Sequence, residues 1–543
     1  MNDSSSQAQS LMSQAIKAMR ENNLSEAIEL SAEMLEIDPN HAGANAVAFT
    51  SLFKSDKFEQ ARRIGGRAAE LNPKSEFILN NQACLQLEAK QPAAAAGLLK
   101  SLIEQYGETA QWMYNLGLAQ RMVGSYQNSV SAFQRTLDLE PEHDKAAFQL
   151  AELYSLTGQL ELAARQYNYL RLLRPRHAPA HSQYIHHYTI AGEASATDLN
   201  QEVALWGERF IPKDKSYPQF IEQHADKLKV GFVVGVIPTS YWSAIVMPLL
   251  NELSADVEIV VYWHDTHNKA LHLEPDVTVV NSSGLNDAEF ARQIRSDQID
   301  TVVDIGGIQV GCRQRVLGMQ VARRQFGWLV HQGTFASNRI TILDEQLGSQ
   351  RFCFDLIDDF DEVNGDSERK MLFAINTNSG LSESTIQTWA QILDELDGWS
   401  LNLDATQPAV QNELRLRFAK YQINAPQIGF DPESRPNKGD VVLENLTNNG
   451  VVNTYTALRR GAAVVALHGE LFPAQQSSAL LTQAGRGDWV VGRRSRYKSK
   501  VLQLIADGGI ESISDTQFKQ SQLHSIGEYA KRMHRILAGE SAD

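Results

Sequence analysis

The chain has 543 residues, a formal net charge of −15 and a pI near 5.5. This length exceeds what one hydrophobic core supports, and it predicts about two to four domains. The acidic balance argues against a nucleic-acid-binding surface, which needs clustered lysine and arginine. The polar, acidic start lacks the basic and apolar regions of a signal peptide, and no membrane span is expected. Because only Cys84, Cys312 and Cys353 occur, without paired spacing, we expect a cytoplasmic protein with neither disulfides nor a zinc site.

The first third of the chain has a period of 34 residues. Pro39, Pro73, Pro141 and Pro175 fall on this period, and Gly107 fills its one vacant place. Tetratricopeptide (TPR) repeats have this period, because each is a pair of antiparallel helices closed by a proline. Mostly small residues stand where the two helices approach each other: Ala15, Phe49, Ala83, Gly117 and Ala151 in the first helices, and Ala27, Ala61, Ala95, Ser129 and Ala163 in the second.

This pattern predicts about five TPR repeats over residues 8–180 and a helical linker over 181–226. Repeat stacks usually bind extended peptide or another protein along their inner helices, so we expect a protein partner or acceptor there. The alternative is that the helices only stabilise or dimerise the chain.

From residue 227 onward, short apolar runs alternate with helical stretches. The first series of runs covers 229–234, 257–263, 301–304 and 326–329, and the second covers 371–375, 400–403, 427–430, 440–443 and 463–467. Such runs are typical of parallel sheets covered by helices on both faces. We predict two Rossmann-like lobes, an N-lobe over 227–365 and a C-lobe over 366–543 that includes a C-terminal helix. Ligands are expected between the lobes, at the carboxyl ends of the strands.

One turn of the C-lobe is a candidate anion site. Neither a GxGxxG nor a GxxxxGK[ST] motif occurs, so nothing supports hydride transfer or ATP hydrolysis. The run over 440–443 leads instead into an Asn-Gly pair and a helix that begins near Val451. Free N–H groups at a helix start can face an anion, although an Asn-Gly pair can also be a plain turn. The candidate donor-binding segment is Asn449, Gly450, Val451, Val452, Asn453 and Thr454.

Several segments resemble the protein O-linked N-acetylglucosamine transferase (Spindly-like) family. They are Asn449-Gly450, the stretch 457–465 (ALRRGAAVV), His468-Gly469-Glu470, 302–307 (VVDIGG) and 328–334 (WLVHQGT). Their order over about residues 8–495, and repeats followed by two lobes, agree with that family. The resemblance implies an α/β protein with an N-terminal TPR solenoid before a GT-B-like pair of lobes, a nucleotide-sugar donor, a protein acceptor and no metal.

The chain departs from the family at the donor site. Val451-Val452-Asn453 stands where the family has His-Thr-Thr against the diphosphate, Thr456 where an acidic residue holds the ribose, and Gly380 near the place of a diphosphate-binding lysine. Two of the family's histidines are also missing, after the first strand of the N-lobe and before the Asn-Gly turn. Each charge-assisted bond lost to a diphosphate is worth about 1.5–3 kcal/mol.

Two explanations of these departures remain open. The donor is different, for instance a CMP-linked nonulosonic acid rather than a UDP-sugar, and the acceptor is a flagellin, as for bacterial proteins of this architecture. Alternatively, the lobes have lost catalysis and the chain is a protein-binding scaffold.

For an active enzyme, the leading candidate base is His331, because histidine has a pKa suited to removing a hydroxyl proton; its alternative role is that of a hydrogen-bonded loop histidine without catalytic function. Asp304, beside Gly306 and Gly307, is a second catalytic candidate, and a structural turn explains it equally well. Glu470 is a candidate acceptor for a sugar or ribose hydroxyl, and helix capping is its alternative role. His468 and Gly469, like Glu470, are further donor-binding candidates. The loops expected to line the cleft contain Gln332, Gly333, Thr334, Asn376, Thr377 and Asn378.

Two groups have the spacing of metal ligands. His177, His181, His186 and His187 lie at helical spacing but have no nearby carboxylate or thiol, so packing roles are favoured. Asp358-Asp359-Phe360-Asp361 has the Asp-x-Asp spacing of some cation-dependent glycosyltransferases, but a solvated loop is favoured.

Overall fold

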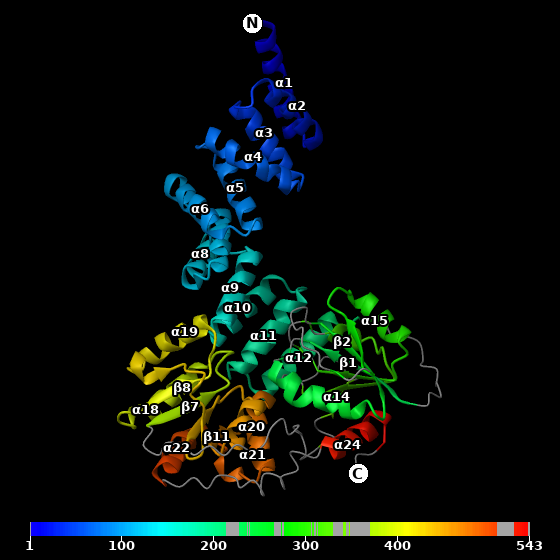
Figure 1. Cartoon of the computed structure of the whole chain (residues 1–543), viewed down its shortest axis with the longest axis vertical. Helices are drawn as coiled ribbons and strands as arrows, with labels where there is room; N and C mark the ends of the chain where they lie inside the picture. Colours follow the sequence, from blue (N-terminus) through cyan, green and yellow to red (C-terminus); the bar gives the residue numbers. More distant parts are fainter. Residues whose placement is uncertain are drawn as a thin grey trace. The chain divides into compact units, whose positions relative to one another are not determined.

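The computed structural model describes residues 2–212, 227–235, 237, 239–264, 273, 276–305, 307–308, 311, 313–329, 340–343, 347, 370–507 and 526–540 (Figure 1). The chain divides between Leu153 and Tyr154 into two compact units. The first unit is helical, and the second combines further helices with two parallel sheets.

Antiparallel helices follow one another in pairs through the first unit. They are α1 (Asn2–Arg20), α2 (Leu24–Ile37), α3 (Ala42–Lys54), α4 (Phe58–Leu71), α5 (Glu76–Glu88), α6 (Pro92–Tyr106), α7 (Ala110–Met122), α8 (Tyr126–Leu139) and α9 (Asp144–Leu156), which runs into the second unit. Pro39 follows α2 by two residues, and Asp38 before it has extended backbone, as the residue before a proline prefers. Gly107 ends α6 with φ of 90°, a conformation that glycine adopts easily.

Close packing within the pairs explains the small residues of the repeat pattern. Ala15, Ala27, Ala61, Ala83 and Ala95 are completely buried. An added Cβ on Gly117 would lie 2.6 Å from the ring of Phe133, so a larger residue would separate α7 from α8. The TPR solenoid predicted from the period is therefore confirmed.

The helical series continues past Pro175. The next helices are α10 (Leu160–Leu173), α11 (Ala178–Ile190) and α12 (Ala196–Phe210). Ser195 and Asp198 cap the start of α12 reciprocally. Residues 181–210, assigned from sequence to a linker, thus belong largely to one more helical pair.

A parallel six-stranded sheet forms the N-lobe. Its strands are β1 (Lys229–Val234), β2 (Glu258–Trp263), β3 (Thr278–Asn281), β4 (Thr301–Asp304), β5 (Arg324–Gly327) and β6 (Thr341–Ile342), in the order β3-β2-β1-β4-β5-β6. The runs at 229–234, 257–263, 301–304 and 326–329 predicted four of them. The mostly exposed β3 and the very short β6 carry too little apolar signal to be seen.

The C-lobe contains a second parallel six-stranded sheet. Its strands are β7 (Met371–Ile375), β8 (Ser400–Leu403), β9 (Ile428–Gly429), β10 (Val441–Glu444), β11 (Ala463–Leu467) and β12 (Val490–Val491), in the order β12-β11-β10-β7-β8-β9. All five predicted runs form strands, and only β12 was missed. Two parallel sheets confirm the predicted GT-B-like pair of lobes.

Helices cover both sheets. In the N-lobe they are α13 (Thr239–Tyr241), the π-helix η1 (Trp242–Val246), α14 (Met247–Leu253), α15 (Asp287–Ser296) and α16 (Gln314–Leu317). After β7 follow α18 (Glu383–Asp394), α19 (Pro408–Ala419), η2 (Ala425–Gln427), α20 (Val451–Arg459), η3 (Phe472–Ala474), α21 (Gln476–Gln483), η4 (Gly487–Trp489), η5 (Arg494–Arg496), α22 (Tyr497–Ala506) and α24 (Ile526–Ala538).

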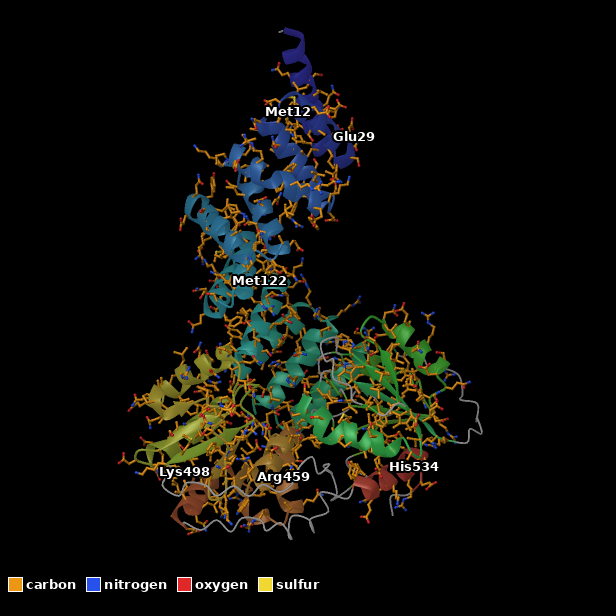
Figure 2. The ribbon with its side chains drawn as sticks, viewed as in Figure 1. Met12, Glu29, Met122, Arg459, Lys498 and His534 are labelled. Carbon is orange, nitrogen blue, oxygen red and sulfur yellow. The ribbon has the colours of Figure 1, made fainter. Side chains whose placement is uncertain are left out.

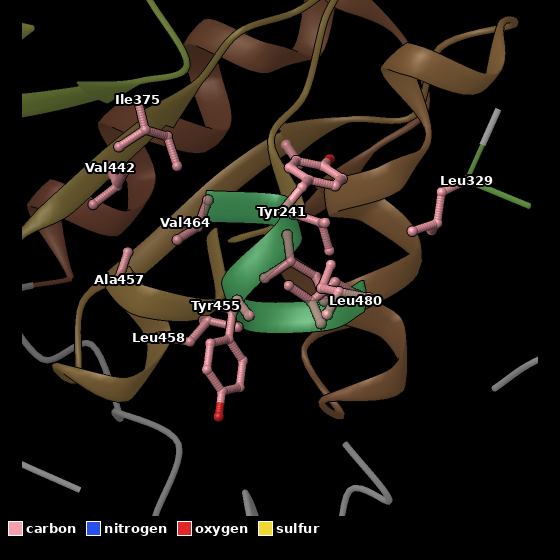
Figure 3. Packing of buried hydrophobic residues seen from close by; sticks show 14 of the residues in the cluster. Tyr241, Leu329, Ile375, Val442, Tyr455, Ala457, Leu458, Val464 and Leu480 are labelled. Atoms are coloured by element: carbon pink, nitrogen blue, oxygen red, sulfur yellow. The ribbon is translucent and has the colours of Figure 1, made fainter. Parts of the chain in front are cut away.

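One apolar core joins the two lobes. Figure 3 shows Tyr241, on the ribbon of the N-lobe, among Val464, Leu480 and Tyr455 of the C-lobe. Helix α24, which the sequence places at the end of the C-lobe, packs on the N-lobe instead, where Thr301 Oγ1 donates to the carbonyl of Leu537 at 3.0 Å. The relative positions of the lobes are therefore fixed by side-chain packing as well as by the connecting chain.

Candidate functional site

Polar side chains gather at the carboxyl ends of three neighbouring strands of the C-lobe sheet. Asn376 follows β7, Asp404 follows β8, and Glu444 ends β10. Asn453, in the first turn of α20, reaches the same group. Ligands of open parallel sheets bind at this edge, so these residues form the candidate site.

Asp404 organises the loop after β7. Its carboxylate accepts hydrogen bonds from the backbone N–H groups of Asn376 and Thr377, both at 2.8 Å, and from Thr377 Oγ1 at 2.6 Å. Asn453 Nδ2 donates to it as well, at 3.0 Å. Burial raises the pKa of Asp404 above its ordinary value, and these hydrogen bonds oppose that rise.

Glu444 is completely buried and equally well bonded. Its carboxylate accepts from Asn376 Nδ2 at 2.6 Å, Ser477 Oγ at 2.7 Å and Thr454 Oγ1 at 2.5 Å. The backbone N–H of Asn445 donates at 3.0 Å. Burial raises the pKa of Glu444 to about 7, so the carboxyl is partly protonated near neutrality.

The start of α20 is crowded by the chain's own side chains. An added Cβ on Gly450 would lie 1.6 Å from Asn376 Oδ1. Gly450 has ordinary backbone angles, φ −130° and ψ 96°, so backbone strain does not explain the glycine. Glycine is required because Asn376 occupies the space of a side chain.

Part of the predicted anion site is already satisfied. The Tyr241 hydroxyl, from the N-lobe, forms a hydrogen bond with the backbone of Val451 and donates to Gln476 Oε1 at 2.6 Å. Within the described part of the chain, the N–H groups of Val452 and Asn453 have no partner. Two N–H donors of this helix start are therefore left for a ligand.

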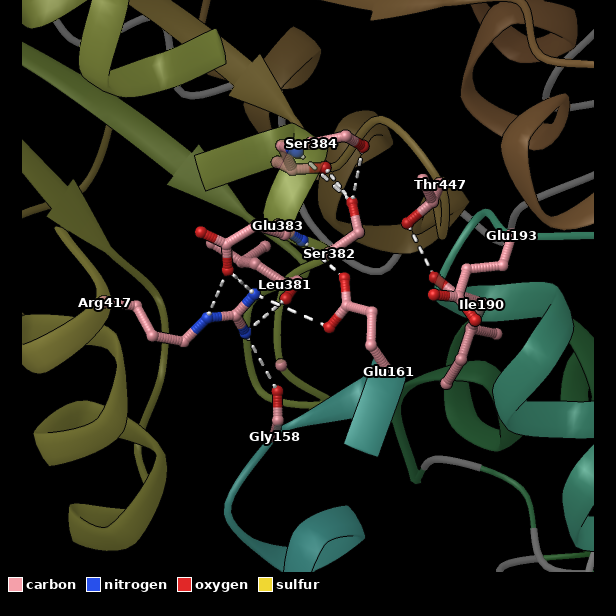
Figure 4. A network of polar contacts seen from close by, with 12 residues as sticks. Gly158, Glu161, Ile190, Glu193, Leu381, Ser382, Glu383, Ser384, Arg417 and Thr447 are labelled. Carbon is pink, nitrogen blue, oxygen red and sulfur yellow. Dashed lines mark hydrogen bonds and ion pairs between the residues drawn. The ribbon is translucent and has the colours of Figure 1, made fainter. Parts of the chain in front are cut away.

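A turn between two helices packs against Gly380, near which the resemblance leads us to expect a lysine. Gly380, with φ of 90°, lies against Gly158 of the turn between α9 and α10, and an added Cβ there would be 2.3 Å from the Gly158 carbonyl oxygen. Arg417 anchors this contact, because its guanidinium donates to the carbonyls of Leu381 at 2.7 Å and Gly158 at 3.4 Å and pairs with Glu383 (Figure 4).

The predicted residues after β11 lie at the surface. His468 is exposed, and its Nδ1 is 2.8 Å from Ser478 Oγ. Glu470 Oε1 accepts from the backbone N–H of Ala196 at 3.0 Å, at the start of α12. Gly469 is packed against Ala474, 2.5 Å from the position of an added Cβ. The observed contact of Glu470 is with a helix start, the arrangement of a capping residue.

Asp304 lies inside the N-lobe, completely buried at the end of β4. Its Oδ2 accepts from the N–H of Gly307 at 3.1 Å and from the Gln314 side chain. These contacts are those of a structural turn. His331, Gln332, Gly333 and Thr334, like Gly306 and residues 358–361, lie outside the described residues.

Sequence reasoning overlooked the two carboxylates at the centre of the site. Asp404 directly follows the run predicted at 400–403, and Glu444 directly follows that at 440–443. The rule that ligands meet the carboxyl ends of parallel strands would have found both.

A ladder of carboxamides in the repeats was also overlooked. Asn81, Asn115, Gln149 and Gln183 stand 34 residues apart, in the first helices of four successive pairs. Asn81 and Asn115 are nearly buried, and Asn81 Nδ2 has no partner among the residues that the structure describes. Carboxamides both donate and accept, which suits them to hold a peptide backbone. The 34-residue period was the available signal.

The described residues contain no group of histidine, cysteine and carboxylate side chains able to hold a metal ion. In the same part of the chain, no helix is long and apolar enough to cross a bilayer. Two of the four clustered histidines bond to other side chains. His181 Nε2 is 2.8 Å from Glu202 Oε2, and His187 Nε2 is 2.8 Å from Ser155 Oγ.

Comparison with solved structures identifies the fold. A point mutant of the O-GlcNAc transferase of Thermobaculum terrenum superposes with a TM-score of 0.67 at 19% identity, over 86% of this chain and 98% of the transferase. The chain has the fold of that transferase. Lower scores are found for Desulfovibrio magneticus MamA (TM-score 0.30, 19% identity, 32% of this chain and 97% of that one) and for the TPR protein YrrB (0.29, 17%, 33% and 93%). No family model and no curated protein sequence matches the chain.

Proposed function

We propose that this chain is a protein O-glycosyltransferase of the Spindly-like type, which captures a protein acceptor on its helical repeats and transfers a sugar to serine or threonine. The observation that carries the proposal is the transferase fold, shared over 86% of the chain. The carboxamide ladder supports peptide capture through Asn81, whose Nδ2 has no partner among the described residues. Asn115, in register on the next first helix, already bonds to Asn80 and Gln111. A flagellin is the acceptor class proposed from the resemblance.

The donor in this proposal carries one phosphate, as a CMP-linked nonulosonic acid does. Gly380 has no room for the diphosphate-binding lysine of the family, because the Gly158 turn fills that space. The half-buried Asp404 and the buried Glu444 stand beside the start of α20, where negative charge on either carboxyl group disfavours the greater charge of a diphosphate. The two unpaired N–H groups, of Val452 and Asn453, are enough for a single phosphate.

The second candidate function is a protein-binding scaffold without catalysis. The contacts within the candidate site favour this function, because every group of Asp404 and Asn376 described above already bonds to another residue of the chain. The two candidates differ in whether any nucleotide binds to the C-lobe.

A thermal-shift comparison of CMP, UDP and their sugar conjugates distinguishes these candidates. A ligand at about 100 times its dissociation constant stabilises the native state by about 2.7 kcal/mol. We expect CMP compounds to raise the melting temperature and UDP compounds to have a smaller effect. Asn453→Asp, which places a negative charge at the start of α20, should remove the CMP effect, whereas Asn424→Asp, exposed before β9, should not.

If neither nucleotide shifts the melting temperature, the scaffold function replaces the transferase. If UDP-sugars bind more tightly than CMP-sugars, the single-phosphate donor is wrong and the transferase can still hold. Mass spectrometry of the captured acceptor then shows whether a sugar is transferred.

A further inference from the structure

A basic run follows the edge strand of the C-lobe sheet. Residues 492–500 read GRRSRYKSK, with five basic side chains and no acidic one, in a chain of net charge −15. We name Arg493, Arg494, Arg496, Lys498 and Lys500 the basic patch. The three arginines are exposed, and their guanidinium groups make no hydrogen bond or ion pair with any described residue. Lys498, labelled in Figure 2, pairs with Glu395.

The fold does not need these arginines. They precede or begin the first turn of α22, where the positive end of the helix dipole makes further positive charge unfavourable. The segment is anchored by its neighbour Tyr497, which is completely buried and donates to the carbonyl of Val465 at 2.9 Å. Three adjacent cations without partners also repel one another, so an external anion would lower the energy of this surface.

The basic patch lies at the edge of the sheet where ligands bind. Its first arginines come directly after β12, and β12 pairs with β11. The backbone N–H of His468 donates to the carbonyl of Val491 at 2.9 Å, which places the exposed His468 beside the patch. The patch therefore shares the carboxyl edge of the sheet with the candidate site but does not include its residues.

We propose that the basic patch binds an acidic segment of a protein partner. Arginine presents a planar fork of N–H donors that matches a carboxylate. The basic patch spans residues 493–500, and half of these lie in α22, where the rise is only about 1.5 Å per residue. An extended peptide rises about 3.3 Å per residue, so this short surface suits about four or five residues of peptide. This contact is additional to the repeats and does not depend on sugar transfer.

Charge outside the patch favours a short peptide over larger polyanions. Without these five side chains the formal charge would be −20. A nucleic acid or an anionic membrane extends far beyond the patch and meets repulsive surface, whereas a short peptide stays within about one Debye length, roughly 8–10 Å, of the arginines.

Fluorescence anisotropy with the full chain tests the proposal. The probe is a fluorescein-labelled decapeptide of alternating glutamate and glycine, and we expect saturable binding that weakens with salt. Arg493→Glu/Arg494→Glu/Arg496→Glu should weaken it at least tenfold. Changing the same three residues to lysine keeps the charge but loses the fork, so it should weaken binding by less than the glutamate changes do.

A matched control changes exposed cations elsewhere. Lys74→Glu/Lys100→Glu/Arg435→Glu alters the net charge equally and should leave peptide binding unchanged. Unaltered thermal unfolding shows that each variant is folded. Absence of peptide binding, or equal loss in the control, overturns the proposal. Tighter binding of a ten-nucleotide DNA or of phosphatidylserine vesicles than of the peptide overturns the choice of a protein partner.

Discussion

Arg417 of α19 holds the turn before α10 and α10 itself against the C-lobe. Of the contacts described above, its removal should weaken this attachment most. Its side chain is only 5% exposed, and it donates to Glu383 Oε2 at 2.8 and 3.2 Å and to the carbonyl of Leu381 at 2.7 Å. Glu161 of α10 lies 3.6 Å from the same guanidinium. We expect Arg417→Met to destabilise the second unit by about 3 kcal/mol.

The magnitude follows from what each partner loses. Removing one member of a buried ion pair costs about 3–5 kcal/mol, because the other charge stays without a partner. Glu383 is 45% exposed and can regain water, whereas Glu161 is 18% exposed and regains less. The lower end of the range therefore applies. Arg417→Lys keeps the charge but loses the fork, and should cost about 1–2 kcal/mol.

Denaturant unfolding followed by tryptophan fluorescence measures this loss. Of the eight tryptophans only Trp112 lies in the first unit, so the signal reports mainly on the second. Arg415→Met, at an exposed position two residues away, is the matched control; it loses only a cation–π contact with Phe430 and should change stability by no more than about 1 kcal/mol. Equal stabilities of the Arg417→Met and Arg415→Met proteins would refute the reasoning.

Three further changes test the site. Gly450→Ala should destabilise the C-lobe by about 1–3 kcal/mol through its clash with Asn376, and Asn376→Ala should relieve part of that loss in the double variant, as urea unfolding would show. The pKa of Glu444 is raised to about 7 from 4.5, so between these pH values the native state holds a proton that the unfolded state releases. The free energy of unfolding should therefore fall by up to roughly 3 kcal/mol as pH rises from 4.5 to 7. Glu444→Gln should flatten that fall, and an unchanged pH profile would contradict the assignment. If the chain transfers sugar, His331→Ala should lower transfer to the acceptor by about a hundredfold or more with partner capture intact, measured by acceptor mass spectrometry.

Periodic features of the fold were predictable from sequence because each repeats a physical requirement. The prolines at 34-residue spacing end helices, and the buried runs at 371–375 and 463–467 form strands. Elements with weak patterns were missed. Strand β12 has only two residues. The helices α11 and α12 were expected to be helical but were not recognised as a further pair, because Pro212, rather than residue 209, comes after the second helix.

The candidate site was only partly predictable, because its contacts join residues far apart in the chain. Asn376 and Asn453 were both named from the sequence, but nothing local shows that they bond to each other and to Asp404. The reason for Gly450 likewise depends on a side chain 74 residues earlier in the sequence. The net charge did not reveal the basic patch, because it is a sum over the whole chain and stays at −15 despite five cations within nine residues.

The absence of a side chain at position 380 and the packing of the helices on the C-lobe are one structural feature rather than two. The turn that holds Gly158 fits against Gly380 only because neither residue has a side chain, and Arg417 bonds to the carbonyl of one and to Leu381 beside the other. A lysine at position 380 would displace the helical turn, break the Gly158 contact of Arg417 and strain a backbone with φ of 90°. A lysine at position 380 and this attachment of the helices to the C-lobe therefore exclude each other, so Gly380→Lys alone should not create a diphosphate site.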